Sequence, residues 1–298
     1  MSRSIEGEDG IVIVAHSKAS YLAEAATLAK SIRRFSPTVP IALITNFDIP
    51  DHTSRTAGFS RVVQRDFTSF PGLEFKLHLE TLSPFSGSSL FLDSDSICYG
   101  DISPVFTAFS GKEFVALGKP LKDCHWFQNA ARTMGSFGIH QFPFFCGDFY
   151  LFRRTPLTQH VFASAREIAG RYDALGINRL GGILNDEPVL SLAMAKHGIE
   201  AEPFGSRWIL QMQAQQLDHV DLDWTIPKAH AVLAGTTVCP RVVHFQAHRT
   251  RPVYYRETFL IHTHGSRFSS KTLSRVIGNF QSLLARASRR ARKTAKRW

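Results

Sequence analysis

The sequence has few cysteines, and their spacing is not typical of a metal site or a redox motif. Its four cysteines are scattered over 298 residues, at Cys98, Cys124, Cys146 and Cys239, and no CxxC pair occurs among them. Scattered thiols are typical of proteins in a reducing compartment. We therefore expect no disulfide framework, and we expect a cytoplasmic protein.

Long apolar runs are also absent. No stretch approaches the ~20 apolar residues that a membrane-spanning helix needs. The first ten residues carry Glu6, Glu8 and Asp9 and contain no apolar core, so we expect no secretory signal peptide.

Acidic residues are missing from the end of the chain. Ten lysines and arginines follow Glu257 and no Asp or Glu does, so residues 1–257 carry 25 charges of each sign. The net charge of +10 therefore belongs to the last segment and says nothing about a basic groove in the body. We expect a catalytic domain over residues 1–257 and a basic helical tail over residues 258–298.

The most informative stretch lies in the middle of the chain. Leu90–Leu92 is a short apolar run typical of a buried parallel strand, and Asp93 and Asp95 follow it at once. Ligands of open α/β sheets bind at the carboxyl ends of the strands. Two carboxylates this close repel each other unless a cation lies between them, and hard divalent ions take oxygen ligands. The same spacing also suits a helix N-cap or an Asx turn, so the dipeptide alone does not decide.

Strands and helices alternate along most of the chain. This pattern predicts an α/β protein with a parallel sheet built from βαβ units. The expected strands are 11–15, 40–45, 61–65, 90–92, 113–117, 149–153 and 241–245, and the expected helices are 19–35, 73–82, 156–172 and 185–196. Residues 119–144 are expected to form a long irregular loop that contains Trp126, Phe127, Phe137 and Phe142, and residues 207–241 give no clear pattern.

Several motifs occur in an order that resembles a known family. They are Leu28-Ala29-Lys30-Ser31-Ile32, Lys76-Leu77, Phe91-Leu92-Asp93-Ser94-Asp95, Gly100-Asp101-Ile102-Ser103-Pro104, Cys146-Gly147-Asp148, Asp186-Glu187, Val243-His244-Phe245 and Arg251-Pro252. Over about residues 11–255 the set is similar to the GT-A fold glycosyltransferases, most nearly family 8, of the glycogenin and lipopolysaccharide galactosyltransferase type. Cys146 stands where that family has Asn, and Glu187 where it has Gln.

The resemblance implies a fold, a reaction and a set of roles. It implies a Rossmann-like mixed sheet flanked by helices, with the basic helical extension added. It also implies transfer of a sugar from a nucleotide-sugar donor, and a UDP-sugar is the donor that the resemblance favours. The acceptor would be a hydroxyl of a glycan or of a lipid-linked molecule, and the cofactor would be Mn²⁺ or Mg²⁺. The implied metal ligands are Asp93, Asp95 and His244; the donor-binding residues are His16, Ser17, Lys76, Asp93 and Arg251; the catalytic carboxylates are Asp148, Asp186 and Glu187.

Elementary chemistry is compatible with these roles and leaves alternatives for each. The imidazole of His244 is a ligand that Mn²⁺ accepts, and it could equally be a hydrogen-bonded core histidine. The fork of Arg251 could clasp a diphosphate oxygen or form a surface ion pair. Lys76 could stabilise the donor or pair with an acidic residue on its own helix. Asp186 and Glu187 begin a helix, where carboxylates also serve as caps.

Two other functions share part of this pattern. Phosphatases of the haloacid-dehalogenase type also use Asp-x-Asp after an apolar strand, but on the first strand and with Thr or Val where Ile97 stands here. A sugar nucleotidyltransferase would carry a Gly-rich phosphate loop after the first strand, and residues 15–19 contain no glycine. A third alternative is a non-enzymatic protein that binds nucleic acid or a membrane through the basic tail, which would leave the neutral body unexplained.

The tail combines an apolar stripe with a cationic end. Leu273, Val276, Ile277, Phe280, Leu283, Leu284 and Ala287 recur at helical spacing, and basic residues and Trp298 follow. We expect an anionic membrane surface as a partner of residues 271–298, on the cytoplasmic membrane face, because a basic amphipathic helix suits that interface. A helix packed on the body is the alternative. Nucleic acid is the weakest candidate because no aromatic residues interleave with the basic ones.

Overall fold

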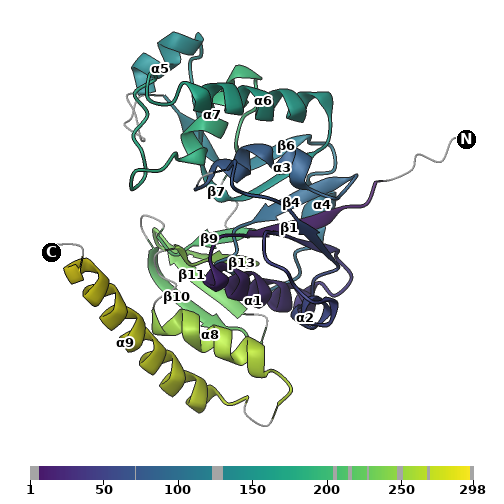
Figure 1. The fold of residues 1–298 in the computed structure, drawn as a ribbon, viewed down its shortest axis with the longest axis vertical. Coiled ribbons are helices and arrows are strands. Elements are labelled where there is room, and N and C mark those ends of the chain that lie inside the picture. The colour runs from purple at the N-terminus through teal and green to yellow at the C-terminus, as the bar shows by residue number, and fades with distance from the viewer. Residues whose placement is uncertain are drawn as a thin grey trace, which may run out of the picture.

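A mixed sheet with helices on both faces forms the body of the protein (Figure 1). A computed structural model describes residues 7–70, 72–122, 130–203, 207–213, 217–226, 228–246, 251–266 and 269–295. Within these ranges the sheet has seven strands in the order β3-β2-β1-β4-β7-β6-β8. Their bounds are β1 Gly10–Ala15, β2 Ile41–Thr45, β3 Arg61–Gln64, β4 Ser88–Leu92, β6 Phe114–Leu121, β7 Phe142–Arg153 and β8 Glu202–Pro203.

One strand of the sheet, β7, runs against the other six. The strands β1, β2, β3 and β4 run parallel, as the βαβ pattern predicts. The strand β7 is antiparallel to both β4 and β6, so the expectation of a wholly parallel sheet is wrong. The mixed sheet that the resemblance implies is confirmed.

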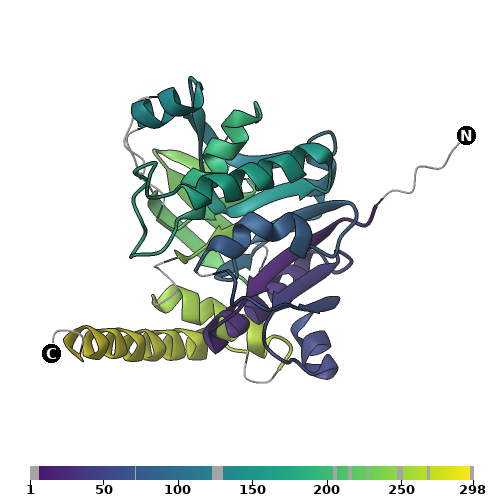
Figure 2. The ribbon, with the colours of Figure 1, turned by 45° about the horizontal axis from the view of Figure 1, so that its top comes forward.

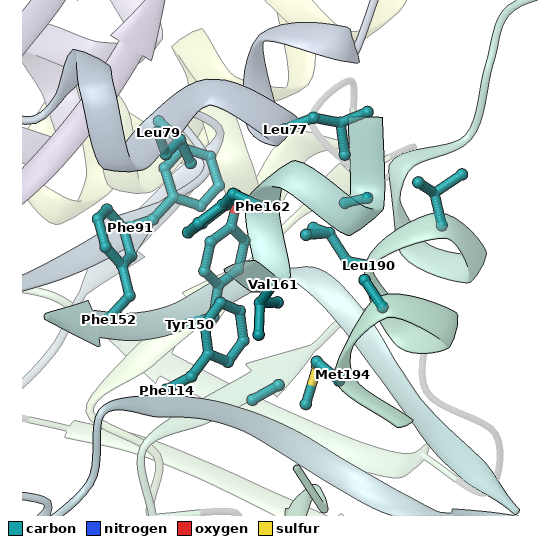
Figure 3. Packing of buried hydrophobic residues seen from close by; sticks show 14 of the residues in the cluster. Leu77, Leu79, Phe91, Phe114, Tyr150, Phe152, Val161, Phe162, Leu190 and Met194 are labelled. Atoms are coloured by element: carbon teal, nitrogen blue, oxygen red, sulfur yellow. The ribbon is translucent and has the colours of Figure 1, made fainter. Parts of the chain in front are cut away.

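Both faces of the sheet are covered, because alternate side chains of each strand point to opposite sides. On one face the aromatic side chains of Phe91, Phe114 and Tyr150 pack against α6 Pro156–Gly170 and α7 Asp186–Lys196 (Figure 3). On the other face α1 Ala19–Phe35 packs against β1 and β2 with α2 Asp51–Ala57 beside it. These two cores fix the carboxyl ends of β1 and β4 at one edge.

A second, smaller sheet lies across that edge. It has the order β5-β13-β9, with bounds β5 Ser96–Cys98, β13 Val242–His244 and β9 Ile209–Gln211. A third sheet pairs β10 Leu217–Asp223, β11 Lys228–Leu233 and β12 Thr236–Val238. These short strands lie in the part of the sequence that shows no clear pattern. They are too brief for an alternation of apolar and polar residues to be recognised.

Two other expectations from the sequence change. The expected helix over 73–82 is a 3₁₀ turn, Glu74–His78, followed by the short α3 Leu79–Leu82. The expected irregular loop over 119–144 begins and ends in strands and contains α5 Ala130–Phe137, with α4 Pro104–Ala108 before it. Trp126 and Phe127 lie outside the described residues.

The chain ends in two helices at the lower end of the molecule (Figures 1 and 2). The first, α8 Pro252–Thr263, runs across the expected domain boundary at residue 257, and the second, α9 Lys271–Ala295, packs against it. The contact uses small side chains, because Ser274 and Ser282 are buried and a Cβ on Gly278 would lie 2.7 Å from the carbonyl oxygen of Pro252. None of the described helices is both long enough and apolar enough to cross a bilayer.

Candidate metal and sugar-transfer site

Two strand pairings place the acidic residues of the central motif. The last residue of β4, Leu92, pairs with Phe149 of β7, and the backbone N–H of Asp93 donates to the carbonyl oxygen of Asp148 at 3.1 Å. Asp93, which follows β4, therefore lies beside Asp148 of β7. Because β7 is antiparallel to β4, carboxylates from distant parts of the chain meet at one edge.

The histidine is placed by the small sheet. Asp95 directly precedes β5, and His244 of β13 pairs with Ser96 in the antiparallel register. The backbone N–H of Phe245 donates to the carbonyl oxygen of Asp95 at 3.1 Å. His244 Nε2 consequently lies 2.9 Å from Asp95 Oδ1 and 3.8 Å from Asp93 Oδ2.

These three side chains form a set of possible metal ligands. One ligand atom from each of Asp93, Asp95 and His244 lies within 4.8 Å of the others. Asp95 and His244 are buried, whereas the side chain of Asp93 remains 24% exposed. Two carboxylates and one imidazole are ligands that Mn²⁺ accepts, and Mg²⁺ accepts the oxygens, so the donor set fits the divalent ion expected from the sequence.

His244 is held from its other side as well. Its Nδ1 lies 2.6 Å from Asp148 Oδ2, and the side-chain amide of Gln211 donates to both oxygens of Asp148 at 3.2 Å. Burial alone would lower the pKa of His244, but the carboxylates of Asp95 and Asp148 outweigh it and raise the pKa well above its usual value. Without a metal ion, the charged imidazolium of His244 is therefore the cation that lies between the carboxylates of Asp95 and Asp148.

Lys76 is the buried cation of the site. Its Nζ lies 3.0 Å from Asp93, donates to the carbonyl oxygen of Gly147 at 2.6 Å and lies 3.7 Å from Asp186 Oδ2. Burial would lower the pKa of Lys76, but the carboxylates of Asp186 and Asp93 raise it, so the side chain stays charged. The carboxylates that Lys76 contacts, Asp93 and Asp186, both lie outside its own helix.

Asp186 and Glu187 lie beside Lys76 at the beginning of α7. Asn185 is the N-cap residue of that helix, because its side chain accepts from the backbone N–H of Glu187. Glu187 Oε1 accepts from the backbone N–H of Gly147 at 2.9 Å, and burial, followed by the charge of Asp186, raises the pKa of Glu187 to about 8. The carboxylates therefore have contacts beyond the helix, and Asn185 supplies the cap.

Gly147 has a steric reason to be glycine. A Cβ at this position would lie 2.4 Å from Asp186 Oδ2 and 3.3 Å from the Cγ of Glu187. The neighbouring Cys146 is no candidate nucleophile, because burial raises the pKa of its thiol and keeps it protonated.

His16 and Ser17 follow β1 at the same edge of the sheet. The ring of His16 stacks on Phe67 with centroids 4.4 Å apart, and its Nδ1 lies 2.7 Å from the Oγ of Ser17. Ser17 has a φ of +66°, and its backbone N–H donates to the side chain of Asn46 at 3.1 Å. Burial lowers the pKa of His16, so the ring is neutral at pH 7.

Arg251 lies apart from this cluster. It is the residue before α8, and its side chain is exposed. Among the described residues, no ion pair or hydrogen bond joins its side chain to the acidic cluster. Residues 247–250, which connect it to β13, lie outside the described part of the chain.

Solved structures of similar shape are sugar transferases. The chain is similar to the galactosyltransferase LgtC in complex with donor and acceptor sugar analogues, with 16% identity, 79% of this chain and 86% of that chain covered, and a TM-score of 0.50. An active-site mutant of LgtC with glutamate in place of a glutamine gives 17% identity, the same coverage and a TM-score of 0.51. The chain has the GT-A fold. The bifunctional glycosyltransferase WbbM gives 11% identity, 90% of this chain and 52% of that chain covered, and a TM-score of 0.55.

The likeness is one of fold and not of close sequence. No model of a known protein family matches the chain, and no curated protein matches its sequence. The fold class and the GT-A resemblance expected from the sequence are confirmed. The haloacid-dehalogenase alternative receives no support from this fold.

One residue of the site, Gln211, is not predicted from the sequence. Gln211 ends β9, which pairs with β13 in a parallel register that places Gln211 opposite His244. The strand has three residues and lies in the segment without a clear pattern, so its sequence alone carries no signal for this role. A short apolar pair before a polar residue is the only hint.

Proposed function

We propose that the protein is a metal-dependent glycosyltransferase that moves a sugar from a nucleotide-sugar donor, a UDP-sugar by resemblance, to a hydroxyl acceptor. One observation carries the proposal. On a GT-A fold, Asp93, Asp95 and His244 converge within 4.8 Å at the carboxyl end of β4, where α/β sheets bind their ligands. The transferases of similar fold support the reaction class.

Asp93, Asp95 and His244 would hold a divalent ion, Mn²⁺ or Mg²⁺. Bound there, the ion supplies positive charge that stabilises the departing nucleoside diphosphate. His244 must then be neutral at Nε2, and its Nδ1 faces Asp148, which is the usual arrangement of a carboxylate behind a ligating histidine.

Asp148 is thus better placed to position His244 than to face the sugar. It is 2% exposed and lies between His244 and Gln211. This role replaces the catalytic role expected for Asp148 from the sequence. Lys76 acts in a comparable way on the other side, where it lies between Asp93 and Asp186. Burial raises the pKa of Asp93 to about 6, and the charge of Lys76 opposes that rise.

The carboxylates of Asp186 and Glu187 are the candidates for direct contact with the transferred sugar. Asp186 Oδ2 is buried, and among the described residues it has no hydrogen-bond partner closer than Lys76 Nζ at 3.7 Å, so it has an acceptor to offer to a sugar hydroxyl. Glu187, with a raised pKa, is protonated at pH 7 and can donate as well as accept. Glu187 stands where the family has Gln, and the active-site variant of LgtC likewise carries glutamate in place of a glutamine.

His16 and Ser17 would contact the nucleotide. Both leave β1 at the edge where β4 ends in Asp93, and the neutral ring of His16 is already stacked on Phe67. Aromatic stacking of this kind suits a planar base. Arg251 keeps a donor-binding role in the proposal, as an exposed cation that would contact the diphosphate of a bound donor.

We further propose an anionic membrane surface as a partner of residues 271–298, which would place the enzyme on the cytoplasmic membrane face near a lipid-linked or cell-envelope acceptor. The small residues of α9 face α8, so its apolar side chains remain outside: Val276 is 62% exposed, Phe280 60% and Leu283 63%. Exposed apolar residues on a basic helix are typical of helices that lie in a membrane interface.

Donor hydrolysis tests the reaction without knowledge of the acceptor. The purified protein is incubated with UDP-sugars and Mn²⁺, and release of UDP is measured. We expect hydrolysis of at least one nucleotide sugar that stops when EDTA is added. Absence of hydrolysis and of calorimetric binding for every nucleotide sugar would reject the proposal.

A further inference from the structure

We propose that a hollow between α1, α2 and α8 binds a phosphate-bearing anion. The hollow has a volume of about 700 Å³ and shares no lining residue with the metal and sugar-transfer site. The three helices that contribute its lining residues lie toward the lower end of the molecule, away from α6 and α7 (Figures 1 and 2). Its charged and imidazole-bearing lining residues are Lys30, Arg33, Arg34, Arg55, His262 and His264. The proposal does not rest on the proposed function.

Three of the cations come from one face of one helix. Lys30, Arg33 and Arg34 are separated by three and four positions near the end of α1, so their side chains are neighbours. All three are half-buried. Arg33 is committed to structure, because it donates to the carbonyl oxygens of Gly58 and Val39 and to the hydroxyl of Ser60.

Lys30 and Arg34 have neutral partners. Lys30 Nζ lies 3.2 Å from His262 Nδ1, and Arg34 Nη1 lies 2.8 Å from His264 Nε2. Burial and the neighbouring cation lower the pKa of each histidine, so both rings are neutral acceptors at pH 7. Neither contact cancels a positive charge.

No acidic residue lines the hollow within the described part of the chain. Arg55 has an ion pair with Asp51 at 3.7 Å, on the exposed surface of α2. The carboxyl-terminal end of α1 offsets roughly half an elementary charge. Among the described lining residues, about two and a half positive charges from Lys30, Arg33 and Arg34 therefore have no counter-charge.

The geometry of Arg34 indicates phosphate as the anion. Its guanidinium lies 4.7 Å from the ring centre of Trp224 and donates through Nη2 to the carbonyl oxygen of Thr225 at 2.6 Å, which fixes its plane. A fixed arginine fork binds oxyanions through two parallel hydrogen bonds. Several cations around one hollow require an anion with several acceptor oxygens and more than one charge, and a phosphate group has both.

Titration of the full-length protein with inorganic pyrophosphate tests the site. EDTA is present, so that no divalent ion recruits the probe to Asp93, Asp95 and His244. We expect saturable binding, weakened about tenfold or more in Lys30→Gln and in Arg34→Gln, because hydrogen bonds to charged groups are among the stronger ones. Lys196→Gln, the same change on α7 at the opposite end, should bind as the wild type does.

Vesicles distinguish a lipid headgroup from a free anion. Phosphatidic acid vesicles present a phosphomonoester, and phosphatidylglycerol vesicles present a phosphodiester. If Lys30→Gln weakens binding only to the phosphatidic acid vesicles, the source is a lipid; if it weakens pyrophosphate binding alone, the source is a free anion. If neither probe distinguishes the two variants from Lys196→Gln, the proposal is wrong. Donor hydrolysis by Lys30→Gln should match the wild type in every case. A negative result for the anion site therefore leaves the proposed transfer reaction untouched, and the reverse also holds.

Discussion

His244 Nδ1 lies 2.6 Å from Asp148 Oδ2 while its Nε2 faces Asp95 at 2.9 Å, so one buried ring joins a carboxylate of β7 to a carboxylate of the turn before β5. Without a metal the ring must be charged to satisfy both. With a metal at Nε2 it keeps only the proton that faces Asp148. Metal binding at this site should therefore release a proton, and Asp148 should decide how well the ring accepts the metal.

The first prediction concerns Asp148. We expect Asp148→Asn to weaken Mn²⁺ binding by about tenfold to a hundredfold, because the carboxylate behind a ligating histidine orients the ring and increases its basicity. Calorimetry with Mn²⁺ measures the change. Activity should recover at high Mn²⁺, which a group that reacts with the sugar would not allow. Unchanged metal affinity together with lost turnover would return Asp148 to a catalytic role.

The second prediction separates turnover from donor binding. Asp186→Asn and Glu187→Gln should lower the rate of transfer more than the affinity for the nucleotide, because their contacts would strengthen in the transition state. Calorimetric affinity for UDP should stay within about threefold of the wild type, which is less than ~1 kcal/mol. Variants that lose nucleotide binding and keep their rate at saturation would assign the pair to the donor pocket.

The third prediction is a pH dependence of stability. Burial and the charge of Asp186 raise the pKa of Glu187 from 4.5 to about 8 in the folded protein, so the folded state binds that proton more tightly than the unfolded state. The stabilisation that this proton brings is complete below pH 4.5 and is lost as the pH rises to about 8. The unfolding free energy of the wild type minus that of Glu187→Gln, measured in EDTA, should fall over this range. A flat or rising difference would contradict the raised pKa.

The fourth prediction concerns the glycine beside these carboxylates. Gly147→Ala should destabilise the fold by about 1–3 kcal/mol, because its Cβ would meet Asp186 Oδ2 at 2.4 Å. Gly135→Ala is the matched control. Gly135 lies in α5, and no atom of the described residues lies within 4 Å of an added Cβ, so alanine there should stabilise by about 0.5–1 kcal/mol. Urea denaturation of both variants measures the contrast, and equal effects would show that the close approach is not rigid.

The fifth prediction concerns α9. The full-length protein should sediment with anionic vesicles and not with neutral ones, and salt should weaken the binding, since each basic residue near an anionic leaflet contributes about 1 kcal/mol. Truncation after Ser270 should abolish it, and Phe280→Ser should weaken it because Phe280 is exposed on the apolar side. Gln281→Ser, an exposed polar neighbour, is the control. Equal sedimentation of the full-length and truncated proteins would reject the membrane surface as a partner.

Local patterns in the sequence predict the first half of this fold well. The helix over residues 19–35 is found with these bounds, and the strand before Asp93 and Asp95 is buried and parallel to β1. Both signals depend on residues close together in the chain. Strong apolar runs and a proline stop are enough to place them.

The rest depends on pairings between distant segments. Short-range sequence patterns do not predict that β7 runs antiparallel to β4, or that a three-residue strand brings Gln211 beside His244. The same holds for α9, whose packing face depends on a distant segment. Its periodicity predicts the helix correctly, but the face that packs on α8 consists of Ser274, Gly278 and Ser282, because small residues allow two helices to approach closely.

The central claim is that Asp95, with Asp93 and His244, holds a divalent ion that sugar transfer requires. The most direct measurement is UDP release from a UDP-sugar by wild type and Asp95→Asn, each with Mn²⁺ and with EDTA, with thermal unfolding as the control for folding. The nearly isosteric change removes one ligand charge from a group that stabilises the leaving diphosphate, which is worth several kcal/mol. We predict that Asp95→Asn is folded and inactive, and that the wild type in EDTA is inactive as well. Full activity of the variant, or of the wild type in EDTA, would contradict the account.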